Sequence, residues 1–295
     1  MTFALLPFIE QGSRYAALCE EAQVTTVTYA LIVIDTTSPN YAASRDAIPN
    51  LVCPSDGKMR NPANVEWTVD EFTEMARSSI APSMGDGLWD NAWAAEDLDS
   101  PSNPTHVRMY HRGVFYPFHW KGMQNITDGT SNTIGLSEIV GTDQGGYGYN
   151  PKVLGGIANA PAIFNGTRFL PAPCLQARST ADRTLIVNPI DSWRGGFFTD
   201  GRSANSAFTT HLPPNSPTCV YAAAQGQELC GVFSVSSFHP GGANAARMDG
   251  SCMFISETID TGTLTTPLDI LVHSESPYGV WGALGTPQGG ESKSL

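Results

Sequence analysis

The sequence is poor in charge, and basic residues are the scarcest kind. Charged residues make up 15% of the chain, and 16 Lys and Arg stand against 28 Asp and Glu, so the formal net charge is -12. No Lys/Arg-rich run occurs. The chain therefore lacks the positive surface with which proteins attract a phosphate backbone or an anionic bilayer. We expect no nucleic acid among its partners.

Long apolar runs are lacking as well. The longest, Tyr29–Ile34, falls far short of the ~20 residues that cross a bilayer, so we expect no membrane span in this chain. The first residues carry no basic region, and Pro7 and Glu10 interrupt their apolar stretch. An export signal is therefore absent from this sequence. Either the protein is cytoplasmic, or the signal has been removed from this chain.

The sequence also lacks the short motifs of common catalytic sites. It contains no Gly-x-Ser-x-Gly elbow, no His-Glu-x-x-His, no P-loop and no dinucleotide-binding fingerprint. A hydrolase would need a group of residues that activates water, and no such pattern is visible. We therefore expect a protein that is not an enzyme.

The six cysteines lie far apart, with no CxxC pair and no Cys/His cluster at the spacing of a local zinc site. Disulfides are the preferred interpretation, and reduced, buried thiols are the alternative. Cys219 and Cys230 are close enough in sequence to close a local loop, although sequence alone does not choose among the possible pairings. The disulfide candidates are Cys19, Cys53, Cys174, Cys219, Cys230 and Cys252.

Glycine and proline are abundant, with 29 and 21 residues, and they favour tight turns between short elements. The composition predicts an α+β fold, rich in β structure, with antiparallel sheets, a short N-terminal helical segment and long surface loops. The helical turns are expected over 4–18 and a short helix over 69–77. Strands are expected over 24–35, 114–120, the end of 126–138, 232–238 and 253–255, the last two joined by a broad Gly-rich loop.

Acidic residues in turns suggest calcium as the candidate cofactor. Asp128, Glu138 and Asp249 lie in or beside Asn-, Ser- and Thr-rich turns, and their oxygens could converge on Ca²⁺ if the loops meet. The alternative is that such residues cap their own backbone. A second acidic group is interpreted as a solvated edge rather than a cation-binding loop. It comprises Asp86, Asp90, Glu96, Asp97 and Asp99.

Two segments, at Asn125 and Asn165, fit the short N-glycosylation pattern, which has meaning only if the export route glycosylates. The six Trp and nine Tyr could form a sugar-binding platform, but such numbers are also usual in a β-rich core.

Six segments in a fixed order resemble one bacterial family, the prepilin-type proteins of the DUF1559 class. The last third holds the motif that names their C-terminal domain, a His, nine residues and Asp-Gly, at His239 to Asp249-Gly250. The companion segments are Leu5–Gln11, Ile48–Asp56, Ile126–Glu138, Pro213–Cys219 and Leu284–Glu291.

The resemblance implies one pilin-like globular domain over 1–295, with an N-terminal part at 1–140 and the H-X9-DG part at 190–295. It also implies a precursor with a basic leader and a long apolar N-terminal helix that anchors pilins and bundles them in filaments. This sequence opens where the family's globular part begins. Three explanations stay open: a shortened chain, a processed form, or a paralogue that assembles through its globular surface.

His239 invites a catalytic interpretation with Asp249 as the orienting carboxylate, but no nucleophile motif accompanies it. A structural motif is preferred, in which Gly241, Gly242 and Gly250 permit tight turns and His239 fixes the loop through both ring nitrogens.

We therefore expect a pseudopilin-like structural or assembly protein, extracellular or on the bacterial cell surface. It would associate with itself and with other surface or secretion-system components. The alternative is an extracellular module that binds a solute or carbohydrate. Such a module should show a deep aromatic-lined pocket, whereas an assembly subunit should expose apolar patches.

Overall fold

The computed structural model of the protein describes residues 5–21, 43–45, 47–57, 66–67, 76–87, 112–115, 121–145, 150–164, 169–221, 231–267 and 274–290. Several predictions lie outside these residues. They are the strand over 24–35, most of the helix over 69–77, most of the strand over 114–120, Asn165, Cys230, Asp90, Glu96, Asp97 and Asp99.

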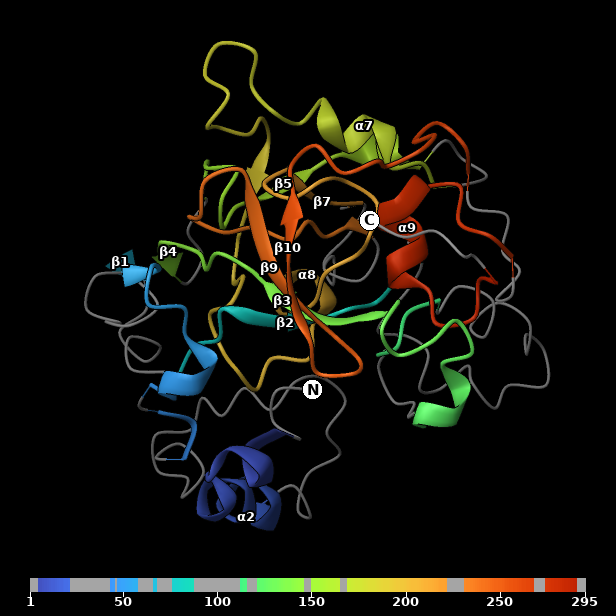
Figure 1. Cartoon of the computed structure of the whole chain (residues 1–295). Helices are drawn as coiled ribbons and strands as arrows, with labels where there is room; N and C mark the ends of the chain where they lie inside the picture. Colours follow the sequence, from blue (N-terminus) through green and yellow to red (C-terminus); the bar gives the residue numbers. More distant parts are fainter. Residues whose placement is uncertain are drawn as a thin grey trace, which may run out of the picture.

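The described elements are short and form an α+β fold that is rich in β structure, which confirms the predicted class (Figure 1). The helices are η1 (Leu6–Ile9), α2 (Gly12–Glu21), η2 (Pro49–Leu51), η5 (Met123–Asn125), η6 (Pro161–Ile163), α7 (Ala172–Leu175), α8 (Ser203–Ser206) and α9 (Gly279–Gly285). The strands are β1 (Glu66–Trp67), β2 (Ile80–Pro82), β3 (Ile134–Glu138), β4 (Gln144–Gly145), β5 (Ile157–Asn159), β6 (Pro189–Ile190), β7 (Thr218–Val220), β8 (Gly231–Val232), β9 (Gly242–Arg247) and β10 (Cys252–Ser256).

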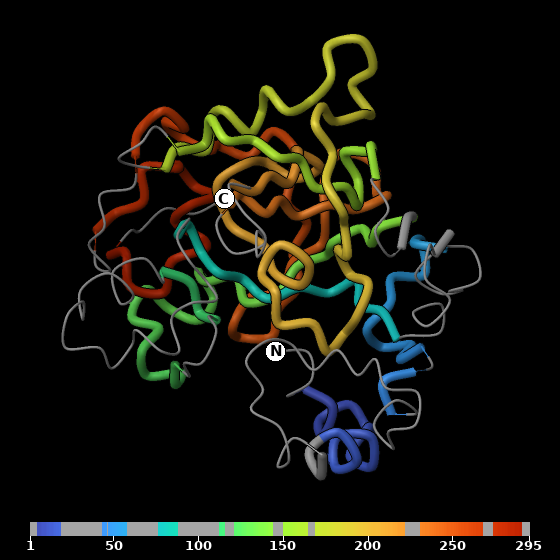
Figure 2. Tube along the Cα trace, turned by 180° about the vertical axis from the view of Figure 1, so that it is seen from behind, coloured from blue at the N-terminus to red at the C-terminus, as the bar shows by residue number. Residues whose placement is uncertain are grey.

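The first sheet has the strand order β10-β9-β3-β2, and all its neighbouring strands are antiparallel. Side chains alternate between two faces along each strand. The inner face packs into a core, on the side where α8 lies against β2 (Figure 2). That core comprises Ala81, Ile134, Ile139, Phe208, Val235, Ala243, Ala245, Ile255, Trp281 and Leu284.

The opposite surface of this sheet, here called the outer face, is turned toward the viewer in Figure 1. It is partly open, because its side chains range from half-buried to exposed. The register of the strands places Leu136 beside Ala246 and Asn244 beside Phe254, and Glu138 lies at the end of β3.

The Gly-rich segment after His239 is a strand, which corrects the prediction of a broad loop between strands over 232–238 and 253–255. β8 ends before that predicted strand does, and β9 begins at Gly242 and pairs directly with β10. A tight turn that contains Gly250, with φ of 86°, joins the two strands. The segment suits a strand because its small side chains alternate between the core and the outer face.

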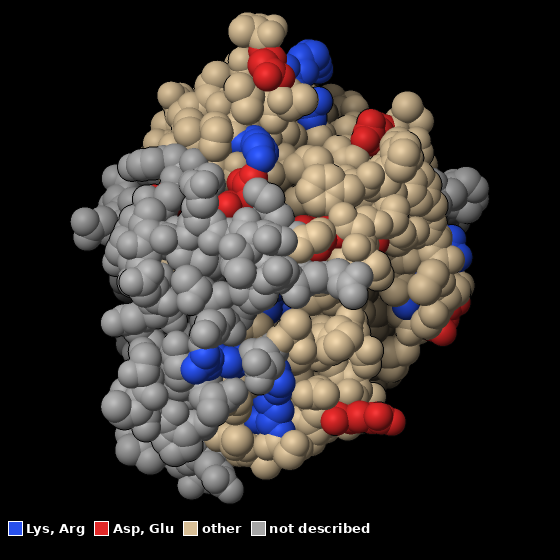
Figure 3. Space-filling model, turned by 90° about the vertical axis from the view of Figure 1, so that its left-hand side faces the viewer, with Lys and Arg blue, Asp and Glu red and all other residues tan. Residues whose placement is uncertain are grey.

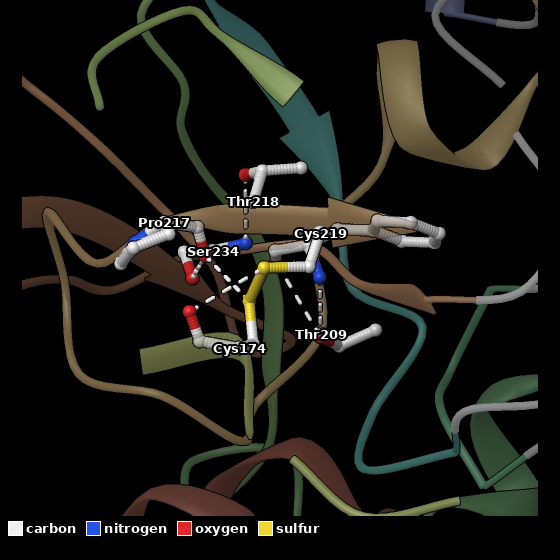
Figure 4. The surroundings of a disulfide bond; sticks show 7 residues. Cys174, Thr209, Pro217, Thr218, Cys219 and Ser234 are labelled. Carbon is white, nitrogen blue, oxygen red and sulfur yellow. Dashed lines mark hydrogen bonds between the residues drawn. A yellow bond between two sulfur atoms is a disulfide. The ribbon is translucent and has the colours of Figure 1, made fainter. Parts of the chain in front are cut away.

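The second sheet, β6-β5-β7-β8, is mixed, because β5 runs parallel to β7. A disulfide joins Cys174 in α7 to Cys219 in β7, with the Cα atoms 5.8 Å apart (Figure 4). Cys219 is therefore not bonded to Cys230, and the local loop considered for this pair does not form. Next to the disulfide, the Ser234 hydroxyl donates to the Pro217 carbonyl at 2.9 Å, and the Ser234 N–H donates to the Thr218 hydroxyl (Figure 4).

Buried charged groups connect the irregular segments between these sheets. Arg194 donates to the carbonyl oxygens of Ala204, Ala207 and Ser234, and burial lowers its pKa to about 9. Asp86 accepts from Arg112 at 2.6 Å, and both side chains are fully buried. The prediction of a solvated acidic edge is therefore wrong for Asp86. This carboxylate is buried, and the ion pair with Arg112 compensates for its loss of solvation.

The N-terminal helical segment is confirmed, since η1 and α2 follow one another over 6–21. Leu6 and Leu18 are fully buried and pack with Ile48, Leu51 and Phe198. Within the described ranges, no helix combines the length and the apolar character that crossing a membrane requires.

Candidate functional site

Three side chains from separate parts of the sequence meet at the end of the first sheet. The Cys53 Sγ lies 3.9 Å from His239 Nε2, and His239 Nε2 lies 3.3 Å from Glu138 Oε1. The potential ligand atoms of all three side chains lie within 4.8 Å of one another. This group, here called the Cys-Glu-His cluster, is the candidate functional site.

Each member of the cluster comes from a different kind of segment. Cys53 follows the short helix η2, Glu138 ends β3 on the outer face, and His239 precedes β9. The side chains of His239 and Glu138 are 33% and 16% exposed, and Cys53 is half-buried. The cluster is therefore held by the fold and remains accessible from solvent.

Hydrogen bonds fix the orientation of the Glu138 carboxylate and the position of the Cys53 backbone. Glu138 Oε2 accepts from the backbone N–H of Asn244 at 2.8 Å, and Oε1, which faces the imidazole, also accepts from the Asn244 side-chain amide at 3.3 Å. The Cys53 N–H donates to the hydroxyl of Ser79, the residue before β2, at 3.0 Å, which connects the Cys53 loop to the start of that strand.

A second layer of bonds positions His239. The backbone N–H of His239 donates to the Ser237 hydroxyl at 2.9 Å, and the backbone N–H of Ser237 donates to Asn215 Oδ1 at 2.8 Å. Asn215 has a φ of 61°, a left-handed conformation that Asn adopts more readily than most residues. We predicted that His239 fixes its loop through both ring nitrogens. Among the described residues, its ring has hydrogen-bond partners only at Nε2, and these are Glu138 and Cys53 rather than groups of its own loop.

The cluster adjoins a cleft of about 810 Å³. Phe238, which is 52% exposed, lines the cleft beside His239. Its charged lining includes Lys152, Arg178 and Arg183 together with Asp143 and Glu257, and Lys152 is paired with Asp143. On the face shown in Figure 3, basic and acidic side chains are interspersed among the described residues.

The calcium set predicted from the sequence is not brought together. Asp128 Oδ2 and Oδ1 accept from the N–H groups of Gly289 and Gly290, at 2.6 and 3.1 Å. Asp249 Oδ1 accepts from the hydroxyl and the N–H of Ser251, and these bonds lower the pKa of the Asp249 carboxyl. The loops of Asp128 and Asp249 do meet, through the bond from the Asp249 N–H to the Thr130 carbonyl. Asp249 caps its own turn, as the alternative proposed, whereas Asp128 caps the backbone of a distant segment.

The carboxylate partner of His239 is likewise different from the predicted one. Glu138 takes this position, and Asp249 is exposed at the far end of the β9–β10 hairpin. Asp249 therefore does not orient the imidazole.

The glycines of the motif have distinct structural roles. A Cβ on Gly242 would lie 1.9 Å from the carbonyl oxygen of Ile255, so only glycine permits this approach of β9 to β10. Gly241 and Gly250 have positive φ values of 82° and 86°, with open space around each. Gly241 and Gly250 therefore adopt backbone conformations that glycine permits in tight turns.

The remaining candidates lie apart from the cluster. Asn125 is half-buried at the end of η5, Cys19 lies in α2, and Cys252 is an exposed free thiol on β10. No structural observation bears on glycosylation of Asn125.

Comparison with known proteins gives one match. A family model described as a protein of unknown function (DUF1559) matches residues 1–262. The chain belongs to the DUF1559 family. No curated protein matches it. No solved structure matches it either.

The segments that carry the DUF1559 resemblance are neighbours in space. The loop with Cys53, the end of β3 and the loop with His239 form the cluster, and Asn215 from a fourth segment supports it. Asp128 binds the glycine pair of the sixth segment, and Leu6 of the first packs on Ile48. The motifs that identify the family therefore build one connected region.

The sequence does not reveal the cluster, because its three residues are not separated by the few positions that are typical of a local metal-binding motif. Cys53 and His239 are 186 positions apart, and Glu138 and His239 are 101 positions apart. The available signal was that Cys53, Glu138 and His239 each lie in a different family motif.

Proposed function

We propose that this protein is a non-enzymatic, pseudopilin-like structural subunit of the bacterial cell surface that associates with copies of itself. The observation that carries the proposal is strand β10, which forms one edge of the first sheet. Its sequence, Cys-Met-Phe-Ile-Ser, contains no charge and no proline. Natural proteins usually protect such an edge with lysine, proline, a bulge or a very short strand.

The backbone of β10 is oriented for pairing with another strand. In the β9–β10 hairpin, the bonds of Arg247 with Ser251 and of Glu257 with Gly241 show which residues face β9. By alternation, the N–H and C=O groups of Cys252 and Phe254 point away from β9, toward the open edge. Phe254 is 48% exposed, so an apolar side chain accompanies these backbone groups.

The opposite edge of the same sheet is protected. β2 is three residues long and contains Pro82, which has no N–H to donate. Two copies would therefore meet at β10 in an antiparallel pair about a two-fold axis, and larger structures would need a further contact.

Sedimentation velocity and electron microscopy of the purified full chain test this proposal. We expect concentration-dependent association that Phe254→Lys abolishes, because a charge on the edge strand opposes pairing. Val187→Lys is the matched control, since Val187 is 42% exposed outside this sheet. A chain that remains monomeric at all concentrations, or equal behaviour of the two variants, would contradict the proposal.

A solute-binding module is the second candidate, and the cleft beside Phe238 favours it. Phe238 is the one aromatic residue among its described lining residues, so the cleft does not match an aromatic sugar platform. Lys152 is paired with Asp143, so Arg178 and Arg183 are the basic lining residues that suit an anionic group of a solute. Calorimetric titration with small carboxylates would separate the two functions, because a binding module should take up such a solute as a monomer.

A further inference from the structure

We infer that Cys53, Glu138 and His239 form a binding site for a transition-metal ion, most suitably Zn²⁺, with a water molecule in the fourth position. The three side chains supply a thiolate sulfur, an imidazole nitrogen and a carboxylate oxygen. This mixture of donors suits zinc and related first-row metals, whereas calcium and magnesium prefer oxygen alone.

The two distances from His239 Nε2 to the other donor atoms match tetrahedral coordination. Zinc bonds of about 2.3 Å to sulfur and about 2.0–2.1 Å to nitrogen and oxygen imply an S···N separation of about 3.6 Å and an N···O separation of about 3.4 Å. The observed separations are 3.9 Å for Cys53 Sγ to His239 Nε2 and 3.3 Å for Nε2 to Glu138 Oε1. The third pair, Cys53 Sγ and the Glu138 oxygen, lies within 4.8 Å, so binding needs this pair to approach by at most about 1 Å.

The shared ring nitrogen distinguishes a metal site from a catalytic triad. In a triad, the nucleophile and the acid occupy the two different nitrogens of the histidine, so that a proton can pass between them. Here both Cys53 and Glu138 face Nε2. One nitrogen cannot donate to the acid and accept from the thiol at once, whereas a cation at the centre of the cluster bonds all three atoms.

The surroundings support the ligands in the way that metal sites require. The backbone N–H of Asn244 holds Glu138 Oε2, and its side-chain amide donates to Oε1 at 3.3 Å, so Asn244 orients the carboxylate with Oε1 toward the position of the metal. The Ser79 hydroxyl holds the backbone of Cys53. A thiolate and a carboxylate together balance the two positive charges of the ion. The partial exposure of His239 leaves a position for water.

Calorimetric titration of the full chain with zinc chloride, after metal removal by a chelator, tests this inference. We expect one zinc per chain and displacement of zinc by neither calcium nor magnesium. Cys53→Ser should weaken the affinity by more than about 100-fold. Asn244→Ala removes the side-chain amide that donates to Glu138 Oε1 and should weaken the affinity by about 10-fold, because removal of an outer partner costs less than removal of a ligand.

Matched controls keep the test independent of folding and of self-association. Cys252→Ser removes another free thiol, and Asp249→Asn removes an acid from the same motif, so both should retain wild-type affinity within about twofold. Phe254→Lys should also retain it, since β10 supplies no ligand. Circular dichroism confirms the fold of each variant, and Glu138→Gln and His239→Gln provide two further tests of ligand loss.

Three results would overturn the inference. They are the absence of zinc binding by the wild-type chain, equal losses for Cys53→Ser and Cys252→Ser, and wild-type affinity in both Glu138→Gln and His239→Gln.

Discussion

Cysteine, acidic and histidine side chains occur in two regions of the protein, which differ in the partners and the solvent exposure of these side chains. In the interior, Cys174 and Cys219 are joined to each other, Asp86 is paired with Arg112, and His211 Nε2 lies 2.7 Å from the carbonyl oxygen of Asp86. In the Cys-Glu-His cluster, the three side chains face one common point and remain accessible.

The difference shows that geometry and access, rather than residue type, decide what these groups can do. Interior groups each have a dedicated partner, and solvent does not reach them. They contribute to stability and connect segments that lack regular secondary structure. The cluster contributes less to the core, but its donors are arranged so that a single ion can join them.

Removal of the disulfide should have the largest effect on stability and should leave the cluster unchanged. The bond spans 45 positions, for which the chain-entropy model gives about 4 kcal/mol. We therefore expect Cys174→Ser/Cys219→Ser to lose about that much free energy of unfolding in denaturant titrations. Zinc affinity of the folded variant should be unchanged, and its loss would show that the two regions are not separate.

His211 should make stability depend on pH, because burial lowers its pKa to about 4. The unfolded chain, with a pKa near 6.5, binds the proton more readily, so stability falls as the pH drops from 6.5 toward 4. The loss should be about 1.4 kcal/mol per pH unit within this window. His211→Gln should remove this part of the slope when denaturant titrations at several pH values are compared, and an unchanged slope would contradict the assignment.

Gly242→Ala should affect both the fold and the cluster. The added Cβ would meet the Ile255 carbonyl, so β9 must shift at a cost of about 1–3 kcal/mol, and with it the Asn244 N–H that holds Glu138. Gly250→Ala is the control in the same hairpin. It has open space and only a strained φ, so it should cost about 1 kcal/mol and leave zinc affinity intact. Equal zinc affinities in the two variants would argue against positioning of the cluster by β9.

Glu138→Gln should have the smallest effect on stability. The amide oxygen can still accept from Asn244, so the free energy of unfolding should change by about 1 kcal/mol or less, as measured by thermal unfolding without metal. A loss as large as that of the disulfide variant would place Glu138 among the structural groups of the interior.

The sequence predicts the fold class, the N-terminal helical turns and the family, because composition and local motifs carry this information. It does not predict β9, since Gly242–Arg247 has a composition typical of loops and forms a strand only through pairing with β3 and β10. Tertiary contacts decide this segment.

The candidate site is harder to predict, because its ligands are distant in sequence. Glu138 is identified from its motif, but its partners are predicted as Asp128 and Asp249. Asp249 caps its own turn, and Asp128 caps the distant Gly289–Gly290 backbone. The burial of Asp86 is missed because its partner Arg112 belongs to another segment.

X-ray absorption spectroscopy at the zinc edge of the metal-loaded full chain tests the central claim most directly. A cluster of Cys53, Glu138 and His239 predicts one sulfur at about 2.3 Å and three nitrogen or oxygen neighbours at about 2.0–2.1 Å. Cys53→Ser should lose the sulfur contribution, and Cys252→Ser should retain it. A wild-type spectrum with nitrogen and oxygen neighbours alone would contradict the account.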